Sequence, residues 1–120
     1  MASGFLTTHV LDTALGVPAH GMRIELYRLS GEARTKLAEK VTNNDGRTDG
    51  PILAENEFET GSYELVFHTG DYQRLSGQTE KSDENLFLST VPIRFTMTEQ
   101  DHYHVPLLFS PFSFSTYRGS

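Results

Sequence analysis

The chain has 120 residues, no cysteine, no tryptophan and a formal net charge of −6. This length fits a single domain over residues 1–120 with one modest core and no deep pocket of its own. The lack of cysteine excludes disulfides, a thiolate nucleophile and a cysteine-type zinc site. The acidic charge argues against a nucleic-acid partner, and no apolar run is long enough to predict a membrane span.

Alternation of apolar and polar residues predicts short strands along most of the chain. In the first strand, residues 6–11, one face consists of Leu6, Thr8 and Val10. The opposite face consists of Thr7, His9 and Leu11. The same period of two recurs at residues 22–27, 63–68 and 91–97. Turn sequences rich in Gly, Pro, Asn and Asp separate these segments. The pattern predicts an all-β sandwich or barrel.

Residues 69–77 break the period of two and predict about two turns of helix that end at Gly77. The polar segment 78–86 that follows predicts a surface loop. We therefore expect a β-sandwich with one short helical crossover.

The last two predicted strands, residues 102–109 and 112–117, are joined by a short Ser110-Pro111 turn and should form a hairpin. In the strand predicted at residues 102–109, one face is apolar and consists of Tyr103, Val105, Leu107 and Phe109. The opposite face is mixed and consists of His102, His104, Pro106 and Leu108. Phe112 and Phe114 are expected on the core face of the final strand, and Tyr117 on the same face as His104. A mixed face without Lys or Glu is typical of a surface that a second subunit covers or that lines a wet cleft.

Three histidines are candidates for chemistry. His102 and His104 lie on one side of a strand, roughly 6–7 Å apart, which permits a metal-binding pair, a general base or two structural polar residues. No carboxylate is spaced to complete a zinc site, so a metal ranks below acid–base work. His9, in the middle of its strand, is either structural or catalytic.

Two further segments carry candidate residues. Arg47 is either a surface arginine paired with Asp45 or Asp49, or a fork for a planar amide or an oxyanion. The chain ends in Tyr117-Arg118-Gly-Ser120 directly after a strand pattern, so the terminus itself is suspected of belonging to a site. Without a thiolate or a Gly-x-Ser-x-Gly elbow, water is the expected nucleophile.

Six segments give the chain a resemblance to the transthyretin-like family: residues 6–12 (LTTHVLD), 16–19, 42–51 (TNNDGRTDGP), 63–70, 102–108 (HYHVPLL) and 110–120. The terminal Tyr-Arg-Gly-Ser, together with His9, Arg47 and His104, resembles the hydrolases of that family rather than its hormone carriers. Phe114 stands where the family often has tyrosine.

The resemblance implies a transthyretin-like (prealbumin-like) sandwich of two four-stranded sheets with one short helix. It implies a homotetramer with active sites at the dimer–dimer interface, acting on a small molecule without cofactor or metal. The implied reaction is hydrolysis of 5-hydroxyisourate to 2-oxo-4-hydroxy-4-carboxy-5-ureidoimidazoline in urate degradation, a branch of purine metabolism. The first residues do not resemble a signal peptide, so a cytoplasmic location is expected.

The resemblance also implies roles for six residues. His9 and His104 would orient and deprotonate the attacking water, with the choice of base left open. Arg47 would hold the carbonyl edge of the substrate and the developing charge. Tyr117 would bind the ring, with Arg118 and Ser120 shaping the end of the pocket. The alternatives are a non-catalytic transthyretin-type carrier of a small aromatic ligand and a β-sandwich interaction domain.

Overall fold

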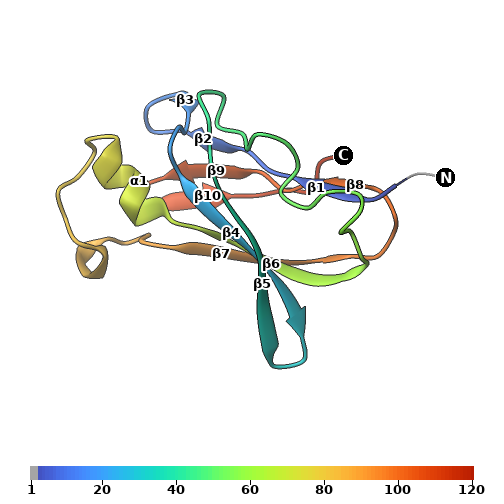
Figure 1. Cartoon of the computed structure of the whole chain (residues 1–120). Helices are drawn as coiled ribbons and strands as arrows, with labels where there is room; N and C mark the ends of the chain where they lie inside the picture. The colour runs from blue at the N-terminus through green and yellow to red at the C-terminus, as the bar shows by residue number, and fades with distance from the viewer. Residues whose placement is uncertain (1–2) are drawn as a thin grey trace.

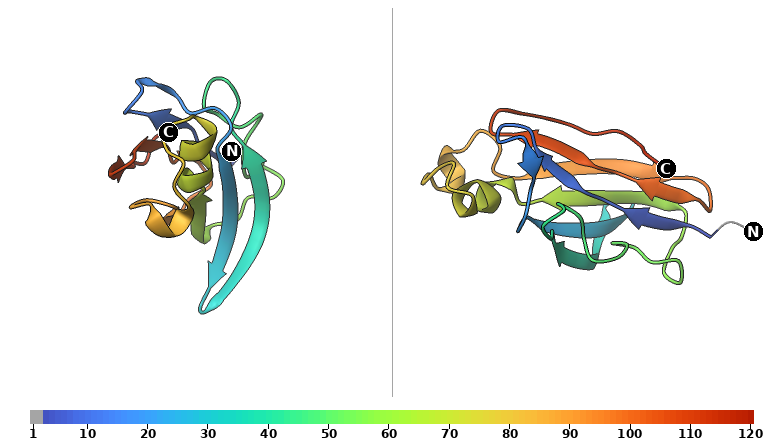
Figure 2. Two further views of the ribbon diagram at one scale, coloured as in Figure 1. Left: turned by 90° about the vertical axis from the view of Figure 1, so that its left-hand side faces the viewer. Right: turned by 90° about the horizontal axis from the view of Figure 1, so that it is seen from above.

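Two layers of β-strands pack face to face in the computed structural model, which describes residues 3–120 (Figures 1 and 2). The first layer contains β1 (Phe5–Thr7), β2 (Val10–Asp12), β3 (Val17–Pro18), β8 (His102–His104), β9 (Leu107–Ser110) and β10 (Ser113–Ser115). The second contains β4 (Arg23–Ser30), β5 (Ala33–Val41), β6 (Gly61–Phe67) and β7 (Val91–Met97).

Two pairs of short strands in the first layer are really single interrupted strands. Thr7 pairs with His104 in the parallel β1–β8 ladder, and Val10 pairs with Leu107 in the parallel β2–β9 ladder. The register is the same on both sides of the interruption, so β1–β2 runs as one strand and β8–β9 as another. The two sheets then have the orders β10-β9-β2-β3 and β5-β4-β6-β7. The predicted sandwich of two four-stranded sheets is confirmed.

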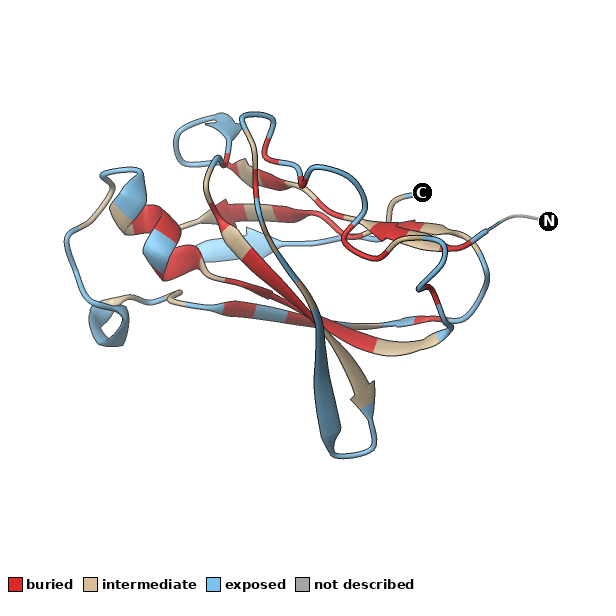
Figure 3. Cartoon of the chain, in the orientation of Figure 1, coloured by how far each residue is buried: buried red, intermediate tan, exposed pale blue. Residues whose placement is uncertain are grey.

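The alternation predicted for the first and penultimate strands is also confirmed. Leu6, Thr8 and Val10 are buried, whereas Thr7 and His9 between them are only half-buried. In β8–β9 Tyr103, Val105, Leu107 and Phe109 are buried, and Pro106 is the one residue of the predicted outward face that is buried as well. Figure 3 shows buried residues along the strands of both layers and on part of the helix α1. The core therefore fixes which face of the first layer turns outward.

The helix α1 (Thr69–Leu75) confirms the predicted short helix, and a 3-10 turn, η1 (Asp83–Asn85), follows it in the polar loop. The predicted crossover is wrong, because the strands that this segment joins, β6 and β7, are antiparallel neighbours in one sheet. Helix α1 lies at one end of the sandwich, and β1 and the C-terminus lie at the other (Figure 1).

The burial predicted for Phe112 and Phe114 is wrong. Phe112 lies in the β9–β10 turn and is 76% exposed, and Phe114 is 44% exposed. Phe114 pairs with the buried Phe109, so its side was predicted correctly. However, β10 is an edge strand, and the opposite sheet does not cover it.

A tight turn packs against the strand that carries His9. Asn43 Oδ1 accepts hydrogen bonds from the N–H groups of Asp45, at 2.9 Å, and Arg47, at 3.2 Å. Gly46 adopts a φ of +72°, and its carbonyl accepts a 2.8 Å hydrogen bond from the N–H of Val10. A Cβ at position 46 would lie 2.4 Å from the carbonyl oxygen of Val10, so only glycine fits this contact.

We expect Gly46→Ala to destabilise the fold more than Gly31→Ala. Both glycines have positive φ, which costs an alanine about 1–2 kcal/mol, but a Cβ at Gly31 meets no atom within 4 Å. The clash with Val10 should add about 1–3 kcal/mol, the usual cost of overpacking. Urea unfolding of the two variants measures the difference, and equal losses would contradict the packing described for the turn.

Candidate functional site

Three imidazoles and one hydroxyl form a continuous row on the outward face of the first layer. Thr7 and His9 alternate with buried residues on β1–β2, and His102 and His104 do the same on the neighbouring β8. Parallel pairing of Thr7 with His104 brings the two sets together. Thr7 Oγ1 lies 2.7 Å from His102 Nε2 and 2.7 Å from His104 Nδ1. His104 Nε2 lies 2.6 Å from His9 Nδ1, and these two rings stack at 4.8 Å.

The two rings of the histidine pair, His9 and His104, differ in what their nitrogens contact. Both nitrogens of His104 are engaged, one by Thr7 and the other by His9. Nε2 of His9 has no hydrogen-bond partner among residues 3–120. His9 is therefore the ring whose nitrogen is open to a water molecule or a ligand.

Both rings of the pair favour the neutral form. Burial, and then the charge of Arg47, lowers the pKa of His9 below its ordinary value. Burial lowers the pKa of His104 to about 4, with further contributions from His9, Arg47 and His102. Because a neutral imidazole can accept a proton, the pair is ready to act as a base at neutral pH.

Arg47 is brought beside the histidine pair by its backbone, which forms an isolated antiparallel bridge with His9. It makes no ion pair with Asp45 or Asp49 in the part of the chain described, and Asp49 accepts instead from the Asn43 amide at 2.9 Å. The surface-pair interpretation of Arg47 is therefore wrong. The arginine is exposed and lines an open hollow of about 320 Å³ with Phe5, Thr7, Thr8, Thr48, Gly50 and Pro51. Its charge is available to an anion.

Gly119, near the C-terminus, contacts His104 through backbone hydrogen bonds, whereas the side chain of Arg118 points to other residues. The Gly119 N–H donates to the His104 carbonyl at 2.6 Å, and the His104 N–H donates to the Gly119 carbonyl at 3.2 Å. Arg118 pairs with Asp101 at 3.2 Å, and its guanidinium lies 4.4 Å from the ring centroid of Tyr103. The side chain of Arg118 is thus held at the edge of the sandwich.

Tyr117 and Ser120, the other two predicted site residues, are both exposed. Tyr117 is 54% exposed and lines, with Arg118, a groove of about 250 Å³ that includes the buried Tyr103 and Val105. Within residues 3–120 it makes no hydrogen bond or ring contact with the histidine pair of the same chain. Ser120 is exposed. One chain therefore brings together His9, Arg47 and His104 but not Tyr117 or Arg118.

Sequence reasoning missed two residues at the site. Thr7 joins His102 to His104, and its place on the outward face with His9 was the signal that could have found it. Gly119 approaches His104 so closely that a Cβ there would lie 3.2 Å from the Cβ of His104. No pattern in the sequence predicts that approach.

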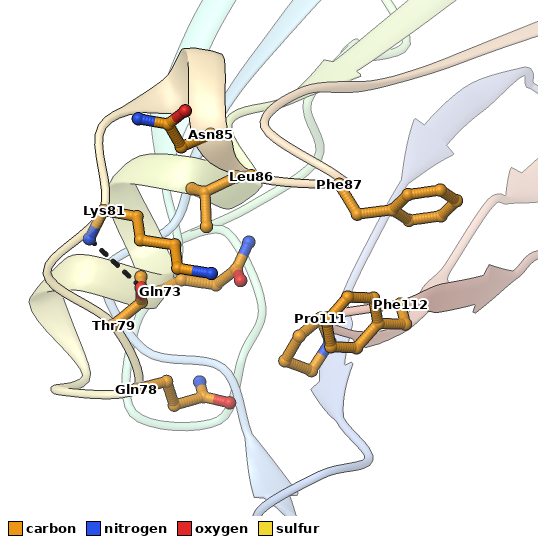
Figure 4. Close-up of a pocket in the computed structure, with 9 residues that line it drawn as sticks. All are labelled: Gln73, Gln78, Thr79, Lys81, Asn85, Leu86, Phe87, Pro111 and Phe112. Carbon is orange, nitrogen blue, oxygen red and sulfur yellow. Dashed lines mark hydrogen bonds between the residues drawn. The ribbon is translucent and has the colours of Figure 1, made fainter.

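Two other features, the contacts of His68 and a hollow beside α1, offer no further candidate for catalysis. His68 Nε2 lies 2.5 Å from Glu25 Oε1, and Arg23 lies 3.3 Å from His68 Nδ1, so both ring nitrogens have structural partners. A hollow of about 290 Å³ between the α1–η1 segment and the β9–β10 turn is lined by one charged residue, Lys81, with the exposed rings of Phe87 and Phe112 (Figure 4). No histidine, aspartate or glutamate lines it.

Residues 3–120 contain neither a candidate metal site nor a helix that could span a membrane. No three His, Asp or Glu side chains there lie close enough together to hold a metal ion. Neither α1 nor any other helix in that range has the length and apolar character that a membrane span requires.

Known proteins match nearly the whole chain. 5-Hydroxyisourate hydrolase 2 of Rhizobium meliloti is 59% identical over 119 residues, covering 98% of each protein. The structure of Klebsiella pneumoniae 5-hydroxyisourate hydrolase is 35% identical with a TM-score of 0.78, covering 98% of this chain and 94% of that one. Sea bream transthyretin in complex with thyroxine is 26% identical with a TM-score of 0.82, covering 95% and 93%. The sequence model of the HIUase/Transthyretin family matches residues 6–119, and the chain belongs to this family.

Proposed function

We propose that the chain hydrolyses 5-hydroxyisourate to 2-oxo-4-hydroxy-4-carboxy-5-ureidoimidazoline, a step of urate degradation, by water attack on a ring amide carbonyl. The observation that carries this proposal is the hydrogen-bonded His9–His104 pair, with one open ring nitrogen, next to Arg47, which makes no ion pair within residues 3–120. The pKa of both rings is lowered, which favours their neutral form. A base and an anion-stabilising group are what hydrolysis of an amide by water requires. The 59% identical relative bears the name of this activity.

His9 is the base in this proposal, since His104 has no free ring nitrogen. For Nε2 of His9 to carry the lone pair, its Nδ1–H must donate to His104 Nε2. His104 then carries its own proton on Nδ1 and donates it to Thr7 Oγ1. His104 thereby holds His9 in the basic tautomer, while Arg47 stabilises the oxyanion that forms as the carbonyl becomes tetrahedral.

The proposed active form is a homotetramer with its sites at the dimer–dimer interface. The hollow beside Arg47 is open, and one chain does not bring Tyr117 near the histidine pair. Leu15, Val17, Phe112, Phe114 and Tyr117 are exposed on this chain, as expected of surfaces that other subunits cover. In this arrangement Tyr117 of one chain binds the substrate ring at the histidine pair of another, and Arg118 and Ser120 shape the end of that pocket.

The second candidate is a carrier that binds a small aromatic ligand without chemistry. The 26% identical sea bream transthyretin in complex with thyroxine favours it. One assay separates the two: 5-hydroxyisourate is generated with urate oxidase, and its ultraviolet decay is followed with and without the protein. Faster decay supports the hydrolase, whereas tight binding of an aromatic ligand without faster decay supports the carrier.

We expect His9→Asn to lower kcat by about 10²–10⁴-fold, because it removes the base. Arg47→Gln should lower it by about 10²–10³-fold, because it removes one oxyanion donor. His20→Asn, a change at an exposed histidine outside the site, is the matched control and should retain wild-type turnover. The ultraviolet decay assay gives the rates, and circular dichroism checks the fold. Wild-type turnover in either site variant would contradict the assignment.

The pH dependence of kcat/KM should reflect the lowered pKa of the histidine pair. The base works only when neutral, and a lowered pKa extends the neutral form to more acidic solution. The activity should therefore persist as the pH falls through 6.5 and decline only below it. In Arg47→Gln the missing cation should move this decline to higher pH. A wild-type decline centred at or above 6.5 would count against His9 as the base.

Complementation between chains tests the placement of Tyr117. We expect Tyr117→Ala and His9→Asn each to be impaired, and their coexpression to restore activity. A mixed assembly contains sites with an intact His9 from one chain and an intact Tyr117 from another. The matched control is His9→Asn coexpressed with Arg47→Gln, which should restore nothing because both residues serve the same chain's site. No recovery in the first mixture, or full activity of Tyr117→Ala alone, would refute the arrangement.

A further inference from the structure

We propose that Thr7 and His102 extend the histidine pair into a proton relay, which carries positive charge from His9 to His102 while water attacks. Neither residue touches the substrate in this scheme, so both are positioning residues. The inference rests on the proposed hydrolase function.

The contacts form one unbroken line of four groups. His9 Nδ1 meets His104 Nε2 at 2.6 Å, His104 Nδ1 meets Thr7 Oγ1 at 2.7 Å, and Thr7 Oγ1 meets His102 Nε2 at 2.7 Å. All three distances are typical of strong hydrogen bonds. Each contact holds one proton, and the hydroxyl of Thr7 can donate in one direction while it accepts from the other. The three protons can therefore shift together, which exchanges donor and acceptor in every contact.

The positions of the protons along the line define the reactive state, in which His9 Nε2 can accept a proton. If Thr7 donates to His102 Nε2, His104 Nδ1–H donates to Thr7 and His9 Nδ1–H donates to His104. His102 then carries its proton on Nδ1, all three rings are neutral, and His9 Nε2 has a free lone pair. In the opposite direction His9 Nε2 bears a proton and cannot act as a base. Thr7 thus selects the active tautomer.

The relay step balances in protons and charge. Water loses a proton to His9 Nε2 as its oxygen bonds to the carbonyl carbon. The His9 Nδ1 proton passes to His104 Nε2, the His104 Nδ1 proton passes to Thr7, and the Thr7 proton passes to His102 Nε2. His102 becomes the imidazolium, and the oxyanion forms beside Arg47. When the ring C–N bond breaks, the protons return along the line, and His9 Nε2–H protonates the leaving nitrogen.

The charges around the line favour His102 as the site where the positive charge rests. His9 and His104 both lie in the field of Arg47, which disfavours a second cation there. His102 is adjacent to the Asp101 carboxylate, which accepts a 2.8 Å hydrogen bond from the His102 backbone N–H. Arg118 also pairs with Asp101 and so offsets part of this attraction.

The ring of His102 is also held in place for this role. It stacks on Phe5 with a centroid distance of 4.1 Å and an angle of 7° between the planes. Its Nε2 is thereby aimed at Thr7, whose own position follows from pairing with His104. Both ends of the relay are therefore held by a stacked ring, His102 by Phe5 and His9 by His104.

The first test compares Thr7→Val, which keeps the shape but removes the hydroxyl, with Thr7→Ser, which keeps the hydroxyl. We expect Thr7→Val to lower kcat by about 10–100-fold, the range for groups that orient metal-bound imidazoles, with KM unchanged. Thr7→Ser should rescue most of this loss. Thr13→Val removes a hydroxyl that donates to the Phe109 carbonyl at 3.0 Å and is the matched control, with wild-type kcat expected. Wild-type kcat in Thr7→Val, or no rescue by serine, would overturn the relay.

A double variant tests whether Thr7 and His102 act together. His102→Phe keeps an aromatic ring against Phe5 but has no nitrogen to accept the proton. If the two residues form one relay, Thr7→Val combined with His102→Phe should be about as slow as Thr7→Val alone. Losses that multiply would show independent roles and refute the relay.

Nitrogen-15 NMR of the histidine rings tests the relay without any substrate. We expect Thr7→Val to change the ring tautomers of both His104 and His102, and Thr7→Ser to leave both unchanged. Tautomers unaffected by Thr7→Val would overturn the relay even in an active enzyme. If the wild-type protein does not accelerate the decay of 5-hydroxyisourate, the hydrolase function fails, and the NMR result still decides whether the four groups are coupled.

Discussion

The parallel pairing of β1–β2 with β8–β9 is the constraint on which the rest of the structure depends. It joins two segments near opposite ends of the sequence, and strand alternation then turns Thr7, His9 and His104 to the same side. A shift of one residue in this register would send one set of side chains into the core and destroy the row of contacts. Burial of Leu6, Val10 and Leu107 opposes such a shift, so the core positions the site.

The chemistry of the site depends on a balance between burial and charge. Partial burial and the nearby guanidinium keep the imidazoles neutral, which makes them available as bases but weakens their hold on a proton. The same guanidinium stabilises negative charge on the substrate. Proton uptake by the histidines and oxyanion formation beside Arg47 therefore assist each other when they occur together, because the two new charges have opposite signs.

Alternation in the sequence predicted an all-β sandwich or barrel and the outward face of the first and penultimate strands, because a period of two reports directly which side a residue occupies. A break in this period predicted the short helix, and the two four-stranded sheets were implied by the family resemblance. The sequence did not predict the exposure of Phe112 and Phe114, since alternation specifies a side but not whether another layer covers it. The choice of base among the histidines depends on which ring nitrogens are already occupied, and Thr7 occupies one of them. The distant position of Tyr117 depends on how the chain leaves β10, where no periodic pattern remains.

The row of histidines joins residues 7 and 9 to residues 102 and 104, which are far apart in the sequence. Contacts between residues far apart in sequence form slowly, because the entropy of closing the intervening loop must be overcome before they stabilise anything. During synthesis, β1 and β2 are made long before their partners β8 and β9. The row of histidines can therefore form only after residues 102–104 have been made, and a shorter nascent chain has no complete site.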